Sequence, residues 1–291
     1  MFHVDREIVT QPQDWARARE LADGVRPLLP APGDRVAFTG CGTSWFMSMA
    51  AASLREQTGL GECDAYTSSE FNHLRRYDHV VAITRSGTTT EVVDLLRHLR
   101  GTTRTTVITA VPGSPVTEIA DHSIVLDFVD EESVVQTRSA TTALALLRAW
   151  LGQDLTQAIA DVELALTAPI DTLAAAQQIS FIGSGWTIAL AQEAALKTRE
   201  AAQFWAEAHP AMDYRHGPIS IAQPGRLVWC FGPVPAGLEA QVRESGADFE
   251  SSTMDPMAHL VLAQRVAVQL AKLRGVNPDA PRGLSRSIIL A

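Results

Sequence analysis

One pattern occurs twice in this chain of 291 residues. In each copy an apolar segment leads into a Gly-x-Gly turn, and a long amphipathic segment follows. The first turn carries Gly40 and Gly42, and the second carries Gly183 and Gly185, 143 positions later in both cases. An internal repeat with this spacing predicts that a supersecondary unit is used twice.

Strand signals alternate with helical signals in both halves of the chain. Such an alternation predicts βαβ units and parallel sheets, so we predict an α/β fold. The domain boundary is expected near residue 152, with one domain over 1–152 and the second over 153–291. The predicted strands cover 36–39, 64–67, 79–84, 105–111, 123–128, 179–182 and 226–231, and the predicted helices cover 13–29, 45–56, 90–99, 140–152, 155–166, 188–204, 238–244 and 258–274.

Charge and composition exclude several classes of protein. The net charge is −9 and no run of Lys or Arg occurs, so a general nucleic-acid surface is not expected. No apolar segment has the length of a membrane span, and the N-terminal residues lack the layout of a signal peptide. Cys41, Cys63 and Cys230 are scattered, which is typical of a reduced protein and not of a disulfide framework or zinc site. We therefore expect a cytoplasmic protein without metal, membrane or nucleic-acid partner.

The first half contains two segments suited to binding an anion. The turn after 36–39 presents backbone N–H groups at a helix start, where the helix dipole favours negative charge. Trp45 occupies the position of the third glycine of a dinucleotide fingerprint, which disfavours a Rossmann cofactor. The segment 84–90 holds five hydroxyl residues together with Arg85 and Gly87. Helix capping explains one hydroxyl rather than five, so we predict a phosphate or similar anion at the carboxyl ends of both strands.

A third polar segment, 136–142, precedes an apolar helix. Its hydroxyl groups are explained equally well by capping and by binding.

The second half carries different chemistry. Its corresponding segment, 232–237, has no Ser or Thr and contains two prolines, which lack an N–H group, so it is not expected to bind phosphate in the same way. Lys197 and Glu200 are spaced to share one helix face, and His216 lies in a predicted loop. The spacing alone fits a solvated charged face as well as a functional pair.

Taken together in this order, the motifs identify a family that the chain resembles. It is similar to double sugar-isomerase-domain (SIS) proteins, which include the isomerase half of glutamine–fructose-6-phosphate aminotransferase, aminosugar-phosphate deaminase/isomerases and fructosamine-phosphate deglycases. The resemblance implies two flavodoxin-like three-layer α/β/α domains with parallel sheets, in a homodimer with a shared active site. The motifs that carry it are Gly40-Cys41-Gly42-Thr43-Ser44, Ser86-Gly87-Thr88-Thr89, Leu196-Lys197-Thr198-Arg199-Glu200, His216-Gly217-Pro218 and Asn277-Pro278-Asp279-Ala280-Pro281.

The resemblance also implies roles for individual residues. Glu200 matches the base that moves a proton between C1 and C2, and Lys197 matches a basic residue that orients or neutralises it. His216 matches a histidine linked to ring opening, which reaches in from the partner subunit. Ser139 matches a serine that contacts the sugar. The phosphate-binding positions of the family fall on Thr43, Ser44, Thr84, Ser86 and Thr89. Gly42 and Arg85 complete the predicted substrate-binding set, although Arg85 stands where a Gln is common in the family.

Arg286 departs from the family pattern. It occupies the position of a lysine that forms a Schiff base with the ketose in the aminotransferase. A guanidinium stays protonated and is a poor imine former, so we expect Arg286 to polarise a carbonyl or bind an anion instead.

The expected activity is that of a phosphosugar aldose–ketose isomerase. More specifically, an aminosugar-6-phosphate deaminase/isomerase would convert an aminosugar phosphate into a ketose phosphate and ammonia. One carboxylate can transfer the proton, so no cofactor is expected. The short arm before the first repeat predicts that no glutamine-hydrolysing domain is present. A fructosamine-phosphate deglycase, which is a hydrolase, and a non-catalytic regulator that binds phosphosugars are the alternatives.

Overall fold

A computed structural model describes residues 1–290, and this part of the chain forms two compact units. The five-stranded unit consists of residues 13–132, 136–155 and 285–290, and the four-stranded unit consists of 1–12, 133–135 and 156–284. Each unit is built on its own sheet. The chain enters each unit more than once, and the single boundary expected near residue 152 stays a prediction.

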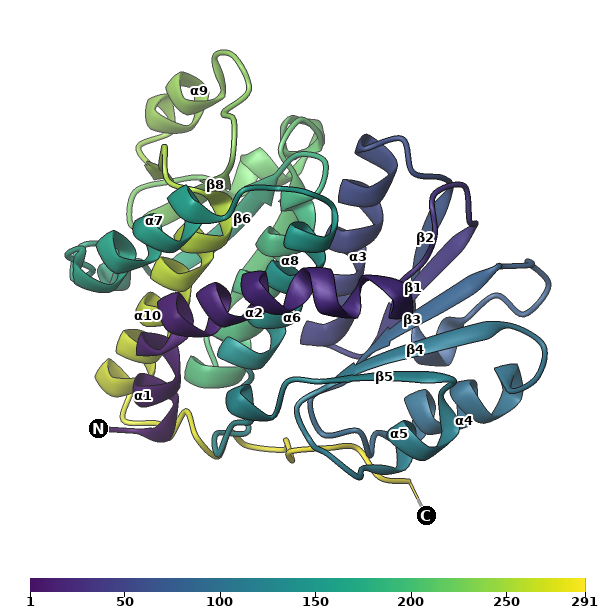
Figure 1. The fold of residues 1–291 in the computed structure, drawn as a ribbon. Coiled ribbons are helices and arrows are strands. Elements are labelled where there is room, and N and C mark those ends of the chain that lie inside the picture. The colour runs from purple at the N-terminus through teal and green to yellow at the C-terminus, as the bar shows by residue number, and fades with distance from the viewer. Residues whose placement is uncertain (291) are drawn as a thin grey trace. The chain divides into compact units, whose positions relative to one another are not determined.

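The sheet of the five-stranded unit is parallel throughout, with the strand order β2-β1-β3-β4-β5. Helices α3 and α6 cover one face, and α4 and α5 lie on the other (Figure 1). The strands are β1 (Val36–Gly40), β2 (Cys63–Thr67), β3 (His79–Ile83), β4 (Arg104–Thr109) and β5 (His122–Val125). The helices are α2 (Gln11–Val25), α3 (Thr43–Gln57), α4 (Thr90–Leu99), α5 (Pro115–Ile119) and α6 (Arg138–Trp150).

Burial explains why the inner strands of this sheet are apolar. All five residues of both β1 and β3 are buried, because helices cover both faces of the sheet. Helix α4 turns Val92, Val93 and Leu96 toward the sheet, where they pack with Ala82 and Val107. The carboxyl ends of β1 and β3 are thereby held next to each other, as their register requires.

The four-stranded unit is also parallel, with the order β7-β6-β8-β9. Helix α10 packs against α8 and α7, while α9 contributes Leu238 and Val242 to a core cluster with Ile182 and Val228. The strands are β6 (Gln178–Gly183), β7 (Ala206–Pro210), β8 (Arg226–Phe231) and β9 (Asp248–Ser251). The helices are α1 (His3–Val9), α7 (Thr156–Thr167), α8 (Thr187–Ala202), α9 (Leu238–Glu244) and α10 (Pro256–Leu273).

The structure confirms an α/β fold with parallel sheets and corrects several predicted elements. The strand predicted over 123–128 ends at Val125, and a 3-10 turn, η3 (Asp127–Val129), follows it. The sequence pattern missed β7 and β9, which are edge strands. β9 has Phe249 as its single apolar residue, because an edge strand needs fewer apolar contacts than an inner one. Helices α1 and α5 were also missed, since each is too short to show a clear period.

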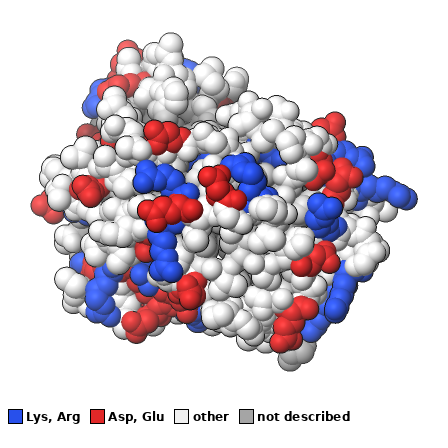
Figure 2. All heavy atoms as spheres, viewed as in Figure 1, with Lys and Arg blue, Asp and Glu red and all other residues white. Residues whose placement is uncertain are grey.

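Charged side chains of both signs are interspersed on the face seen in Figure 2. Within residues 1–290, no helix is long and apolar enough to cross a membrane. Over the same range, no group of three or more His, Cys, Asp or Glu side chains is arranged to hold a metal ion.

Candidate functional site

The turn after β1 is tightly packed. A Cβ atom at Gly40 would lie 2.7 Å from Ser44 Cβ and 2.9 Å from the carbonyl oxygen of Ile83, so only glycine fits. The turn starts α3 at Thr43, and the side chains of Thr43 and Ser44 are both buried. Burial raises the pKa of the Cys41 thiol in the same turn, which disfavours a nucleophilic thiolate there.

The segment after β3 is anchored to β4 and folded on itself. The backbone N–H of Thr84 donates to Ile108, and the hydroxyl of Thr109 donates to the carbonyl of Arg85 at 3.1 Å. The N–H of Thr88 donates to Ser86 Oγ at 3.3 Å, and the Thr88 hydroxyl oxygen lies 3.1 Å from the same atom. The hydroxyl groups predicted for an anion site are therefore gathered in one compact loop.

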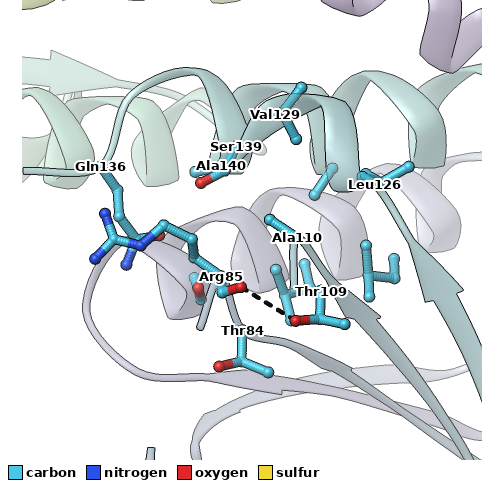
Figure 3. Close-up of a pocket in the computed structure, with 13 residues that line it drawn as sticks. Thr84, Arg85, Thr109, Ala110, Leu126, Val129, Gln136, Ser139 and Ala140 are labelled. Atoms are coloured by element: carbon cyan, nitrogen blue, oxygen red, sulfur yellow. Dashed lines mark hydrogen bonds between the residues drawn. The ribbon is translucent and has the colours of Figure 1, made fainter. Parts of the chain in front are cut away.

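A pocket lies between this loop and α6 (Figure 3). Its volume is about 10 Å³, which is room for one water molecule. Four predicted site residues, Ser44, Thr84, Arg85 and Ser139, line it. The other four predicted binding residues, Gly42, Thr43, Ser86 and Thr89, are not among its lining residues.

Two residues without a predicted role belong to this site, and one of them, Gln136, begins the polar segment 136–142. Glu131 has a side chain with 0% exposure and lies 3.7 Å from Arg85 Nη1 through its Oε2 atom. Gln136 lines the pocket, and its buried Oε1 atom has no hydrogen-bond partner within residues 1–290. Glu131 stands in an acidic stretch typical of a solvated loop, so only its position just before a hydroxyl-rich helix start could have indicated a buried role.

The segment 286–290 lies along the hydroxyl loop. Thr88 Oγ1 donates to Ser287 Oγ at 2.9 Å, and the backbone N–H of Thr90 donates to Ile288 at 3.1 Å. The guanidinium of Arg286 contacts the carboxylate of Asp130 and the backbone carbonyl of Glu131. Arg286 is thus placed beside the pocket, although its charge is paired with an acidic side chain.

The predicted acid–base residues lie in the four-stranded unit, on α8. The ammonium of Lys197 contacts the carboxylate of Glu200, as the spacing predicted. Lys197 also lies 3.6 Å from Glu193, which the sequence places one turn earlier on a similar face of the helix. The side chain of Glu200 is 19% exposed, whereas Glu193 is 1% exposed and Lys197 2%. Of the three, Glu200 is therefore the group that a ligand can reach.

His216 is exposed and ends the short 3-10 helix η5 (Asp213–His216). Within residues 1–290, no hydrogen bond or ion pair joins it to Lys197 or Glu200. The structure therefore does not bring His216 together with these residues, and its proposed role across a subunit boundary stays a prediction.

Comparison with known proteins agrees with this architecture. The sequence pattern of the SIS domain family matches residues 31–151, so this segment is a SIS domain. Glutamine–fructose-6-phosphate aminotransferase (isomerizing) from Sulfurisphaera tokodaii is 28% identical over 88% of this chain and 50% of its own length. The Xylella fastidiosa protein of the same name is 25% identical over 98% of this chain and 58% of its own length. The chain thus spans 50 to 58% of these curated relatives, and it is homologous to them.

Solved structures share the fold. A glucosamine-6-phosphate deaminase from Thermotoga maritima has a TM-score of 0.82 at 22% identity and covers 99% of this chain and 100% of its own. A tagatose-6-phosphate ketose/aldose isomerase from Escherichia coli has a TM-score of 0.79 at 21% identity, with 95% of each chain covered.

These comparisons correct the expectation of a double SIS protein. The family pattern matches one SIS domain and does not extend over the second half of the chain. The turn at 232–237 has no hydroxyl residue, whereas the loop at 84–90 has five. This contrast agrees with a family match that is confined to the first half of the chain.

Proposed function

We propose that this protein is a phosphosugar isomerase and, more specifically, an aminosugar-6-phosphate deaminase that forms a ketose phosphate and ammonia. The loops after β1 and β3 would hold the phosphate, with Ser44, Thr84 and Ser86 as hydrogen-bond donors. Glu200 would carry the proton between C1 and C2, and no bond to the protein would form. For an aminosugar, the same proton transfer yields an imine that water hydrolyses.

The observation that carries this proposal is the position of Glu200. A general base must be held in place and must reach its substrate. The contact with the ammonium of Lys197 holds the Glu200 carboxylate in place, and its partial exposure leaves it accessible. Further support comes from the homology to the isomerizing aminotransferases and from the fold shared with a deaminase and an isomerase of phosphosugars.

The direct test uses glucosamine 6-phosphate and galactosamine 6-phosphate, with ammonia and ketose phosphate measured as products. Glu200→Gln should lower turnover by about 10²- to 10⁴-fold, the usual share of general base catalysis, while ligand binding by calorimetry is retained. The matched control is Glu244→Gln, because Glu244 is exposed on α9 of the same unit. Full activity of Glu200→Gln would reject Glu200 as the base.

The wild-type protein separates the alternatives. Release of a free amino acid from a fructosamine phosphate would identify a deglycase. Binding of sugar phosphates without any product would identify a non-catalytic phosphosugar-binding protein. Either result replaces the proposed activity.

Assembly is tested by complementation. If His216 acts from a partner subunit of a homodimer, mixing Glu200→Gln with His216→Ala chains should restore part of the activity. If the subunits are shown to exchange and no activity is recovered, Glu200 and His216 do not act on the same site from two different chains.

A further inference from the structure

Glu131 places a buried carboxylate group at the start of α6. Its Oε1 atom accepts hydrogen bonds from the backbone N–H of Thr137 at 2.6 Å, from the Thr137 hydroxyl at 3.0 Å and from the backbone N–H of Arg138 at 2.9 Å. These backbone N–H groups belong to the cap and first residue of α6, where a helix has no partners of its own. Oε1 of Glu131 therefore caps the N-terminal end of α6.

The second oxygen of Glu131 determines what Ser139 can do. Oε2 accepts the hydroxyl hydrogen of Ser139 at 2.7 Å and lies 3.7 Å from Arg85 Nη1. A serine hydroxyl has a single hydrogen, so a serine that donates to a carboxylate offers only lone pairs to other partners. Ser139 lines the pocket, and toward a bound molecule its oxygen is an acceptor.

Gln136 adds a second acceptor to the same pocket. Its Oε1 atom is buried and unpartnered within the described residues, and Figure 3 shows its side chain at the end of the pocket where Arg85 lies. A buried acceptor without a partner costs about 1–3 kcal/mol, which a ligand that donates a hydrogen bond would recover. The α6 side of the pocket therefore offers acceptors, whereas the loop at 84–90 offers hydroxyl groups.

We propose that Glu131 is a positioning residue that holds the Ser139 hydroxyl as an acceptor, so that Ser139 and Gln136 together select a ligand that places a single hydroxyl or ammonium donor in this one-water pocket, next to its phosphate. This inference rests on the proposed function, in which the ligand is a sugar phosphate. Glu131 itself touches no substrate and acts through Ser139.

Glu131→Gln tests the proposal with almost no change of shape. The remaining carbonyl oxygen can keep the three hydrogen bonds at the start of α6. The new amide group replaces Oε2 and donates to Ser139 Oγ, so the serine hydrogen turns away from residue 131 and toward the pocket. By calorimetry, the affinity for glucosamine 6-phosphate should fall about tenfold, as expected for one mismatched buried hydrogen bond. The affinity for inorganic phosphate should not fall, because Arg85 loses a neighbouring negative charge.

Four further variants separate positioning from folding. Thr137→Val removes one hydrogen bond to Oε1 without changing Ser139, and it should lower the melting temperature while leaving the ratio of the two affinities unchanged. Ser139→Ala should give the same selective loss for glucosamine 6-phosphate as Glu131→Gln. The double variant should lose no more than Ser139→Ala alone. If Glu131→Gln does not fold, Ser139→Ala and Gln136→Met carry the test, each with the same expected loss.

The outcomes distinguish this inference from the proposed function. If the wild type binds or converts glucosamine 6-phosphate and Glu131→Gln or its substitutes leave the ratio of affinities unchanged, the positioning role is overturned and the proposed function stands. If the wild type binds inorganic phosphate but no sugar phosphate, the proposed function fails and this inference fails with it.

Discussion

The Nζ atom of Lys197 lies 3.6 Å from Glu193 Oε1, and both side chains are almost completely buried on α8. The same ammonium contacts Glu200, which is partly exposed. One cation thus neutralises a buried carboxylate and an accessible one. Lys197 therefore stabilises the buried part of α8 and also holds the predicted base, Glu200, in position.

Lys197→Met should destabilise the protein strongly. The substitution keeps most of the side-chain volume but leaves the carboxylates of Glu193 and Glu200 without their cation. Removing one partner of a buried ion pair costs about 3–5 kcal/mol, and denaturant unfolding at pH 7 measures it. Lys272→Met is the control, because Lys272 is exposed and Asp5 is partly exposed, so their pair should contribute only about 0–1 kcal/mol. Equal losses in both variants would contradict the buried-pair account.

Stability should fall in mild acid because of His79 on β3. Burial lowers the pKa of His79 to about 4, while Nε2 pairs with the Thr106 hydroxyl at 2.8 Å. In the unfolded chain His79 is protonated below the ordinary histidine pKa of about 6.5, whereas in the folded protein it is protonated only below about pH 4. The free energy of unfolding therefore decreases as the pH falls through this window, by up to about 1.4 kcal/mol per pH unit. His79→Gln should remove this part of the dependence in denaturant titrations at pH 7 and pH 5, and an unchanged dependence would refute it.

Gly87→Ala should disrupt the anion loop. The residue has φ of +66°, and an added Cβ would lie 2.0 Å from Ser114 Oγ. Gly101→Ala is matched to it, with φ of +77° and nothing within 4 Å of the added atom. The cost of a positive φ, about 1–2 kcal/mol, is common to both variants. Any further decrease in the free energy of unfolding of Gly87→Ala therefore measures the clash with Ser114. Calorimetry with inorganic phosphate should show weakened binding in Gly87→Ala and unchanged binding in Gly101→Ala.

Ser287→Ala should strengthen phosphate binding. Ser287 Oγ accepts a hydrogen bond from Thr88 and lies 3.3 Å from Thr89 Oγ1, so it competes with a ligand for these hydroxyls. Freeing them should raise the affinity for inorganic phosphate by about two- to tenfold, which corresponds to one ordinary hydrogen bond. Ser53→Ala on α3, whose hydroxyl bonds to Gln57, serves as the control. A weaker affinity would show instead that Ser287 belongs to the binding site.

Elements with strong local signals were predicted well. Helix α4 runs over Thr90–Leu99 and β8 over Arg226–Phe231, as the apolar pattern indicated. Both elements bury a continuous apolar surface, so their periodicity is visible in the sequence. The edge strands β7 and β9 were not visible, because their polar residues reflect a place at the rim of a sheet.

The candidate site was predicted only in part. Ser44, Thr84 and Arg85 line one pocket because each follows an inner strand of the same parallel sheet. His216 lies on an exposed turn, without a contact to Glu200 within the described residues. Glu131 was missed because an acidic residue in a polar segment gives no sign that it will be buried.

The sequence by itself determined the alternation of strands and helices and the position of the hydroxyl-rich turn at the end of β3. These are local properties, set by apolar periodicity, glycine and side-chain type. Only the tertiary structure decided that Glu131 pairs with Arg85 and takes the hydrogen of Ser139. The choice of hydrogen-bond partner depends on distance and burial between segments that are separate in the chain, and no local pattern contains that information.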